Sequence, residues 1–416
     1  MKLKTLTTAM ILATVPMTGV FAAAMDRSGQ SIAAFLQPGN YFEAGISVLD
    51  PSVSGTSSAA LGNQATGDMA SDYYFPSAAL KLQVTDNFSF GLLYDQPFGA
   101  EADYTTQSNA FNPTGTDGTQ AEVKTENLTF LFGFQPNENW NIYAGPAYQT
   151  AQGNVSLRGQ AYSLLSGYDA SMKKDGELGW VAGLAFQIPD IALKASLTYR
   201  SEIDHELSTS ENVGPVDVRT AAVGGLVQAS GGQITPAMAN AMVPQFTPGK
   251  TGVKTPQSVN LDFQTGVMAD TVAFANVRWV DWDGFAIRPN DFGQALDALG
   301  QVVPALSGGN LVEYNEEQWS ATVGVGRKFN EKWAGNVSVG WDSGVDNPVT
   351  TLGPTEGYWN VGLGLQFSPA PNYFIAGGVK YFWLGDAQAL TVANPNVGNF
   401  EDNHALGYGL KMGYRF

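Results

Sequence analysis

The chain has 416 residues, contains no cysteine and carries a formal net charge of −17 at pH 7. The lack of cysteine excludes disulfides and thiolate metal sites, and the acidic balance argues against nucleic acid as a partner. The chain is 44% hydrophobic and 12% aromatic, with a mean hydropathy of −0.09. A helical membrane protein is far more apolar, whereas a membrane β-barrel has ordinary hydropathy because half of its strand residues face water.

The first 24 residues have the three parts of a secretory signal peptide. Lys2 and Lys4 give a basic start, residues 6–20 form a short apolar run, and residues 21–24 end the run with small side chains. We therefore predict a signal peptide over residues 1–24. A membrane anchor is the alternative, but the run is shorter than the ~18 residues that a spanning helix needs.

Residues 25–39 precede the first expected strand and include Ile32, Phe35 and Leu36. We predict that this segment enters a barrel formed by residues 40–416 and acts as a short hatch, with Phe35 and Leu36 as candidate ligand contacts. The alternative is a disordered mature N-terminus.

Most of the chain alternates between apolar and polar residues with the period of a β-strand. Six short connections are rich in Asn, Asp and Pro, which suit tight turns: residues 85–87, 136–139, 189–190, 269–270, 330–332 and 368–372. Seven longer connections alternate with them: residues 51–72, 97–119, 152–176, 206–255, 285–313, 344–356 and 391–402. This alternation predicts an all-β fold, a fourteen-stranded antiparallel transmembrane β-barrel with short periplasmic turns and long extracellular loops.

The last nine residues, 408–416, form the clearest single strand. One face carries Tyr408, Leu410, Met412, Tyr414 and Phe416, and the other carries only glycine, lysine and arginine. We expect this strand to pair with residues 41–49 and close the barrel, because a bare apolar edge invites aggregation. A soluble β-sandwich or propeller is the alternative, but it would have to bury the aromatic faces of all these strands.

Two of the long loops have helix-like spacing of apolar residues, over 219–230 with 236–246 and over 295–303. The short helices either pack on each other and cap the barrel, or form an apolar groove for a hydrophobic ligand, and the two interpretations are compatible. The candidate groove residues are Leu164, Leu165, Val223, Leu226, Val227, Met238, Met242 and Phe246. Arg158 is a candidate for attracting an anionic headgroup. Arg200 either joins a luminal network with wall carboxylates or contacts the ligand.

Three segments resemble the FadL-type outer-membrane transporters of long-chain fatty acids and other hydrophobic compounds. They are residues 44–55, residues 197–202 (Leu-Thr-Tyr-Arg-Ser-Glu) and residues 279–282 (Trp-Val-Asp-Trp). The resemblance covers essentially the whole mature chain. It implies a luminal hatch, an apolar groove in the third and fourth extracellular loops, and a lateral exit at a kinked third strand. Here that exit would lie at Pro97, Phe98 and Gly99, since proline cannot donate a ladder hydrogen bond.

Two departures from that family concern gating and substrate. The segment before the first strand is short and lacks the Asn-Pro-Ala signature of the family hatch. Residues 315–320 (Asn-Glu-Glu-Gln-Trp-Ser) are acidic where many members carry cations. A cation that pairs with a fatty-acid carboxylate therefore cannot be transferred to these positions, and the substrate can equally be another lipid or an uncharged hydrocarbon.

We expect no catalytic site, no bound metal and no cofactor, because His205 and His404 are the only histidines and lie far apart in the sequence. The predicted function is passive transport of long-chain fatty acids or similar hydrophobic compounds across the outer membrane of a Gram-negative bacterium. The expected partners are the hydrophobic solute, outer-membrane lipids with lipopolysaccharide, and the barrel assembly machinery, and we expect a monomer. A general diffusion porin with an open lumen and an outer-membrane enzyme or adhesin are the alternatives.

Overall fold

The computed structural model describes residues 25–345 and 347–416, so the predicted signal peptide lies outside the described residues. The strands are β1 (Tyr41–Ser52), β2 (Gly55–Ser57), β3 (Tyr73–Gln83), β4 (Phe88–Asp95), β5 (Gly99–Asp103), β6 (Gln120–Phe134), β7 (Trp140–Ser156), β8 (Tyr168–Ile188), β9 (Leu193–Arg200), β10 (Ile203–Leu207), β11 (Thr209–Val213), β12 (Thr251–Thr255), β13 (Ser258–Met268), β14 (Thr271–Val280), β15 (Phe285–Ile287), β16 (Val312–Tyr314), β17 (Gln318–Lys328), β18 (Trp333–Asp342), β19 (Val349–Thr350), β20 (Tyr358–Ala370), β21 (Tyr373–Leu384), β22 (Ala387–Thr391), β23 (Asn394–Phe400) and β24 (His404–Arg415). The helices are α1 (Val218–Ala229), α2 (Pro236–Met242) and α3 (Asn290–Leu299), with 3-10 turns η2 (Ala59–Leu61), η3 (Gln160–Leu165), η4 (Pro189–Ile191) and η5 (Pro304–Leu306).

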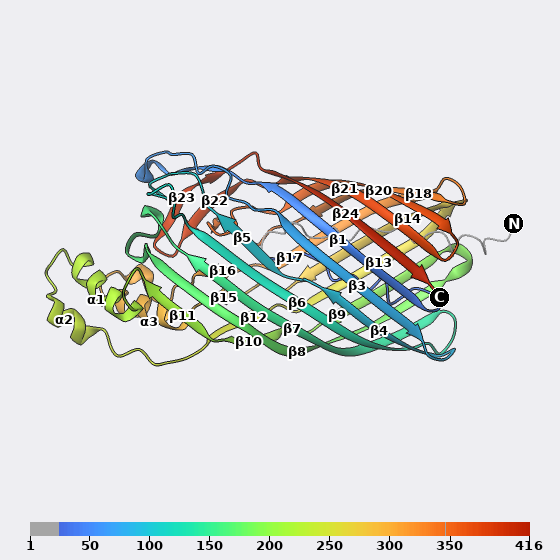
Figure 1. Ribbon diagram of the computed structural model, residues 1–416, viewed down its shortest axis with the longest axis horizontal. Helices are drawn as coiled ribbons and strands as arrows, with labels where there is room; N and C mark the ends of the chain where they lie inside the picture. The colour runs from blue at the N-terminus through green and yellow to red at the C-terminus, as the bar shows by residue number, and fades with distance from the viewer. Residues whose placement is uncertain (1–24, 346) are drawn as a thin grey trace.

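Sixteen strands form one closed antiparallel sheet, and fourteen of them make the barrel (Figure 1). The other two are β5, which pairs only with β6, and β11, which extends the edge of β8. The barrel closes between β1 and β24, where Tyr41 pairs with Arg415 and Val48 with Tyr408. The fourteen-stranded fold is therefore confirmed, together with the pairing of the first and last strands.

The outer surface carries two bands of aromatic side chains. One band lies beside the short turns and includes Phe88, Phe134, Trp140, Trp333, Tyr373 and Phe416, all of them exposed. The other band lies eight to ten residues further along the strands, as from Trp333 to Trp341 on β18 and from Tyr373 to Trp383 on β21, and pairs Trp341 with Trp359 and Trp359 with Trp383. At about 3.3 Å per residue and a strand tilt of about 40°, the bands lie roughly 20–25 Å apart, close to the height of the apolar belt of an outer-membrane barrel.

No helix among the described residues is long and apolar enough to cross a membrane. The three helices gather at the end of the barrel opposite the C-terminus (Figure 1). The structure corrects one predicted loop, because residues 152–156 and 168–176 belong to β7 and β8, whose hairpin continues beyond the outer aromatic band. The predicted loop over residues 152–176 was too long, because the glycines and charged residues of this segment lie in a solvent-exposed hairpin.

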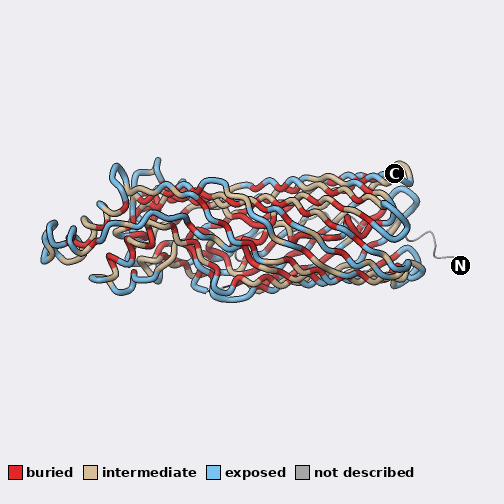
Figure 2. Tube along the Cα trace, turned by 90° about the horizontal axis from the view of Figure 1, so that it is seen from below, coloured by how far each residue is buried: buried red, intermediate tan, exposed pale blue. Residues whose placement is uncertain are grey.

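Two hydrophobic clusters fill the interior. The larger extends from the extracellular loops down to Met25 and Phe98, and the smaller surrounds Phe35 in the periplasmic half. Figure 2 shows buried residues along the full length of the barrel and into the loop region, with exposed residues at the loop tips and turns and also along the outer wall. The lumen is therefore occupied along much of its length.

Candidate functional site

The third barrel strand is broken at Pro97. β4 ends at Asp95 and β5 begins at Gly99, and both pair with the continuous strand β6. Pro97 lacks an N–H group, so it cannot contribute a donor to a ladder. The displaced segment is held instead by Thr125 of β6, whose hydroxyl donates to the Phe98 carbonyl at 2.7 Å and accepts from the Phe98 N–H at 2.9 Å.

The break leaves a bounded gap between β3 and β5, which we call the wall window. Its periplasmic edge is the last β3–β4 pair, Ala78 with Tyr94, and its extracellular edge is the bridge between Ala70 and Ala102. Between these points, the described residues contain no backbone pairing between the two strands. Tyr94 lies six residues along β4 from Phe88, and its side chain contacts Glu126, whose exposed ion pair with Lys174 indicates that the window opens toward the lipid headgroups.

The N-terminal segment (residues 25–39) pairs with the broken strand in place of β3. Asp26 forms an antiparallel bridge with Phe98. The Gly99 N–H donates to the Met25 carbonyl at 2.8 Å, and the Arg27 N–H donates to the Pro97 carbonyl at 2.7 Å. The backbone groups that the window leaves unpaired on this side are thus satisfied by the N-terminal segment.

Two side chains close the window from within. The Tyr73 hydroxyl on β3 donates to the Glu101 carbonyl at 2.7 Å and accepts from the Glu101 N–H at 2.8 Å. The Arg27 guanidinium lies over the Tyr73 ring, with its Cζ atom 3.9 Å from the ring centroid. Behind them is a small cavity of about 30 Å³, bordered also by Phe75, Gly99 and other residues of the loops.

A buried ion pair anchors the N-terminal segment to the opposite wall. Arg278 of β14 donates from Nε to Asp26 Oδ2 at 2.6 Å, and the two side chains are only 3% and 4% exposed. Arg278 also donates to Gln30 Oε1 at 3.0 Å and to Asn260 Oδ1 at 2.6 Å. Because every charged atom of the pair has a partner, removal of either Asp26 or Arg278 would leave a buried charge without its partner.

The periplasmic part of the N-terminal segment is held by the close packing of Phe35 against wall glycines and by hydrogen bonds from two lysines. The Phe35 ring lies over Gly91 and Gly133, where an added Cβ would come within 2.3 Å and 2.8 Å of the ring. Lys194 of β9 donates to the Leu36 carbonyl at 2.9 Å, and Lys81 of β3 donates to the Gln37 carbonyl at 2.7 Å. Beside the segment, a cavity of about 490 Å³ runs along β9, β13, β14, β17, β18, β20 and β21.

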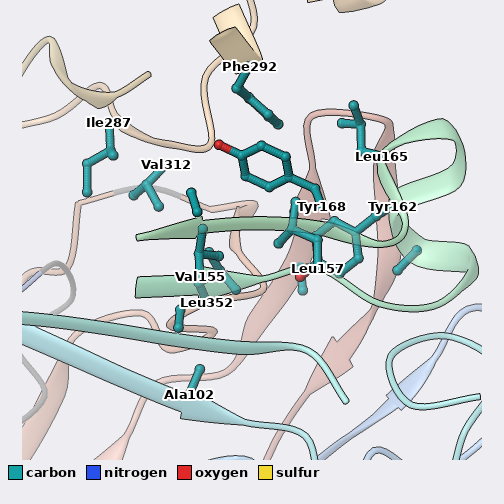
Figure 3. Close-up of a cluster of buried hydrophobic side chains, with 14 of the residues drawn as sticks. Ala102, Val155, Leu157, Tyr162, Leu165, Tyr168, Ile287, Phe292, Val312 and Leu352 are labelled. Atoms are coloured by element: carbon teal, nitrogen blue, oxygen red, sulfur yellow. The ribbon is translucent and has the colours of Figure 1, made fainter. Parts of the chain in front are cut away.

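Above the window, aromatic rings fill the extracellular half of the lumen. Trp282 is fully buried, contacts the Phe98 ring edge-on with centroids 5.4 Å apart, and contacts Phe285 and Tyr314 on its other sides. The Trp282 Nε1–H donates to Gln318 Oε1 at 2.7 Å. Figure 3 shows the neighbouring part of this cluster, in which Tyr168 and Phe292 lie against each other and Leu157 and Tyr162 approach from the loop between β7 and β8.

The predicted groove residues join this cluster with unequal burial. Leu226 and Leu165 are buried, whereas Met238 is 52% exposed because α2 turns Ala239 inward instead. The remaining predicted residues of the loops pack partly buried against the cluster: Leu164, Val223, Val227, Met242 and Phe246. Phe35 and Leu36 lie apart from them, in the periplasmic cluster.

The two predicted cationic contacts differ in their surroundings. Arg158 is engaged by Asp117 and Asp169 at 2.7 Å and 2.8 Å, so its charge is used within the loops. Arg200 is 7% exposed, and its Nε and Nη1 atoms have no protein hydrogen-bond partner. Arg200 and Phe98 border a void of about 10 Å³, which has room for about one water molecule.

Charged groups also order the extracellular loops. The Glu211 carboxylate accepts from the Asp291 and Phe292 N–H groups at 3.0 Å and 2.7 Å, which caps the start of α3. Burial raises the pKa of Glu211, although these hydrogen bonds act to lower it.

Burial lowers the pKa of His205 on β10, and the nearby Asp175 opposes that shift.

Sequence reasoning located the break at Pro97 but missed Asp26, Arg27, Tyr73 and Arg278. One available signal was the inward position of Arg278, between the outward Val277 and Trp279, together with the acidic Asp26 near the start of the N-terminal segment. The contact of Tyr73 with Glu101 had no signal, because both residues resemble ordinary strand and loop positions.

A closed barrel with two aromatic bands, an occupied lumen and a broken third strand defines an outer-membrane transport barrel. The chain belongs to the OMPP1/FadL/TodX family of outer membrane transport proteins, whose family model matches residues 23–416. It is an outer-membrane transporter of hydrophobic compounds, located in the outer membrane of a Gram-negative bacterium.

Solved structures share this fold at low sequence identity. A Pseudomonas aeruginosa FadL homologue superposes with a TM-score of 0.68 at 16% identity, covering 92% of both chains. The Pseudomonas putida toluene transporter TodX superposes with a TM-score of 0.60 at 12% identity, covering 95% of this chain and 96% of that chain. The Ralstonia pickettii toluene transporter TbuX gives 0.57 at 12% identity, covering 96% of this chain and 97% of that chain. No curated protein matches the chain significantly in sequence.

Proposed function

We propose that the protein takes up long-chain fatty acids or similar amphipathic molecules by a lateral route. The extracellular aromatic cluster receives the apolar part of the solute, the N-terminal segment blocks the axial path as a hatch, and the wall window releases the solute into the outer leaflet. The observation that carries this proposal is the docking of the N-terminal segment onto the broken strand at Phe98 and Gly99.

Apolar burial supplies the driving force for capture. A buried CH₂ group contributes about 0.8 kcal/mol, so an acyl chain gains several kcal/mol on leaving water without any headgroup contact. Phe98 and Trp282 connect the aromatic cluster directly to the window, which supports a continuous apolar path from the loops to the wall.

The lateral exit requires less rearrangement than an axial one. An axial path must break the buried Asp26–Arg278 pair and displace Phe35 from its glycine-lined site. The window needs the Tyr73 hydroxyl and Arg27 to move, and β3 and β5 share no ladder between its two edges. The occupied lumen also counts against the open diffusion porin. An enzymatic role has no support in the site that we describe.

Two relatives of the same fold are toluene transporters by name, so an aromatic hydrocarbon is the second candidate substrate. The aromatic lining of the extracellular cluster favours it. We further expect the protein to act as a monomer among lipopolysaccharide, after insertion by the barrel assembly machinery.

Conductance and uptake measured together test the proposal. The purified barrel in a planar bilayer should show no stable open-channel current, while proteoliposomes containing it should take up oleate faster than empty vesicles. Deletion of residues 25–39 should raise the conductance. A stable current through the intact protein would favour the porin, and unchanged conductance after the deletion would remove the hatch from the proposal.

A further inference from the structure

We infer that Arg27 recognises the carboxylate of an amphipathic solute in the wall window. This inference rests on the lateral route proposed above and specifies its substrate class, a monocarboxylate with an apolar tail. It assigns to the N-terminal segment a second role, since the residue that reads the solute headgroup belongs to the hatch rather than to the barrel wall.

The guanidinium of Arg27 is held in a fixed position with one donor group unused. Its Cζ atom lies 3.9 Å from the centroid of Tyr73 and 5.5 Å from that of Phe75, so stacking fixes the plane of the group. Its Nη2 atom is buried and has no hydrogen-bond partner in the protein. A buried guanidinium nitrogen without an acceptor is costly, and a carboxylate oxygen would satisfy it.

The backbone is shaped to admit Arg27. A Cβ atom added at Gly99 would lie 2.7 Å from both the Cζ and Nη1 atoms of Arg27, and 2.7 Å from the Val123 carbonyl oxygen. Only a residue without a side chain lets the guanidinium cross β5 at the window.

The cavity beside Arg27 has the size of the group that it would receive. It measures about 30 Å³, and about 10–15 Å³ holds one water molecule, so it has room for two water-sized atoms. A carboxylate presents two oxygens of that size. The rest of the lining is largely apolar, with Leu49, Met69, Phe75 and Leu352, and suits the first methylene groups of a tail.

Two protein carboxylates also border the cavity, and they determine how strongly a solute carboxylate would bind there. Asp26 is neutralised by Arg278, which contacts both of its oxygens at 2.6 Å and 3.2 Å. Glu101 stands opposite Glu122 in the β5–β6 ladder, and Glu122 pairs with Lys124. The negative charge of Glu101 therefore weakens the attraction between Arg27 and a solute carboxylate, which favours release of the solute over tight binding.

The level of the window in the barrel suits an amphiphile. The window begins at Tyr94, and the adjacent outer surface carries the exposed ion pair of Lys174 with Glu126. Such charges mark the headgroup region, because they would be expensive within hydrocarbon. A carboxylate held at Arg27 would thus remain at the interface while its tail enters the outer leaflet.

Paired probes of equal length test the inference on the full-length barrel. We would measure binding of dodecanoate and of 1-dodecanol to the intact protein and to the Arg27→Met and Arg27→Lys variants. Lys254→Met, which removes an exposed loop cation paired with Glu202, serves as the matched control for charge. We expect Arg27→Met to weaken dodecanoate binding about tenfold, Arg27→Lys to weaken it less, and dodecanol binding to stay unchanged in all variants.

Equal losses for dodecanoate and dodecanol in Arg27→Met would show that Arg27 only shapes the segment, and would overturn the inference. Unchanged dodecanoate binding in Arg27→Met would also overturn it. A selective loss of dodecanoate binding, combined with uptake that continues when the window is cross-linked, would support Arg27 as the recognition residue and refute the lateral route. The two proposals therefore fail separately.

Discussion

The hydroxyl of Tyr73 connects β3 to Glu101 across the wall window, and it both donates to and accepts from the Glu101 backbone, at 2.7 Å and 2.8 Å. A side chain thus replaces the ladder that β3 and β5 lack. One hydroxyl thus satisfies two backbone groups at the window, and the position of its ring contributes to the closed state.

Tyr73→Phe should loosen the window while keeping the ring beneath Arg27. The change leaves the Glu101 N–H and carbonyl without their partner, which costs about 1–3 kcal/mol for buried groups. We expect faster amide hydrogen exchange over residues 99–103 and faster solute uptake. Tyr408→Phe, on the lipid-facing surface where Tyr408 is 45% exposed, is the control and should change neither. Unchanged exchange over residues 99–103 in Tyr73→Phe would show that the hydroxyl does not hold the window closed.

Asp26→Asn or Arg278→Met should free the N-terminal segment. Either change leaves a buried charge without its partner, and breaking such a pair typically costs about 3–5 kcal/mol. We expect fluctuating current in planar bilayers and proteolytic cleavage within residues 25–39. The double variant should be less affected than either single variant, because it removes both charges. A silent bilayer recording for both single variants would mean that the pair does not anchor the segment.

Gly91→Val should expel Phe35 from its site, since even the Cβ atom would lie 2.3 Å from the Phe35 ring. The predicted consequence is raised conductance, and Phe35→Ala added to Gly91→Val should restore the low level by making space. Gly377→Ala is the matched control, because its nearest neighbour would be 3.6 Å away. Failure of Phe35→Ala to rescue Gly91→Val would indicate that the valine acts on the wall itself.

His205 should make the β10–β12 hairpin sensitive to acid. Burial lowers the pKa of this imidazole, so the neutral form is favoured in the folded protein. The unfolded state therefore binds the proton more readily, and the stabilisation that is present above about pH 6.5 is lost as the pH falls through the lower folded pKa. The protection factors of the amides in residues 203–207 and 251–255, which correct for the intrinsic pH dependence of exchange, should fall below pH 6, and this fall should disappear in His205→Gln. Equal acid sensitivity in His205→Gln would exclude this histidine as the cause.

The barrel was predictable because its rules are local. Alternation along residues 408–416 and the short turns rich in Asn, Asp and Pro suffice to count fourteen strands, and closure then requires β24 to meet β1. The break at Pro97 was predictable for the same reason, since the missing N–H is a property of one residue.

The partners across the lumen were not predictable from the sequence. Asp26 and Arg278 lie 252 positions apart, and no local pattern indicates that a residue of the N-terminal segment meets that strand. The inward-facing side of α2 was also predicted wrongly. Met238 was expected to face a ligand groove because of its flexible apolar side chain, but the packing of α2 against α1 buries the smaller Ala239 instead.

Cross-linking the wall window tests the central claim most directly. Because the protein has no cysteine, Ser77→Cys on β3 and Gln96→Cys at the break can be joined by a short cleavable bifunctional reagent without competing sites. We predict that the cross-link stops uptake of oleate into proteoliposomes, that oleate binding persists, and that cleavage of the reagent restores uptake. Uptake at the uncross-linked rate with the window joined would contradict the lateral route.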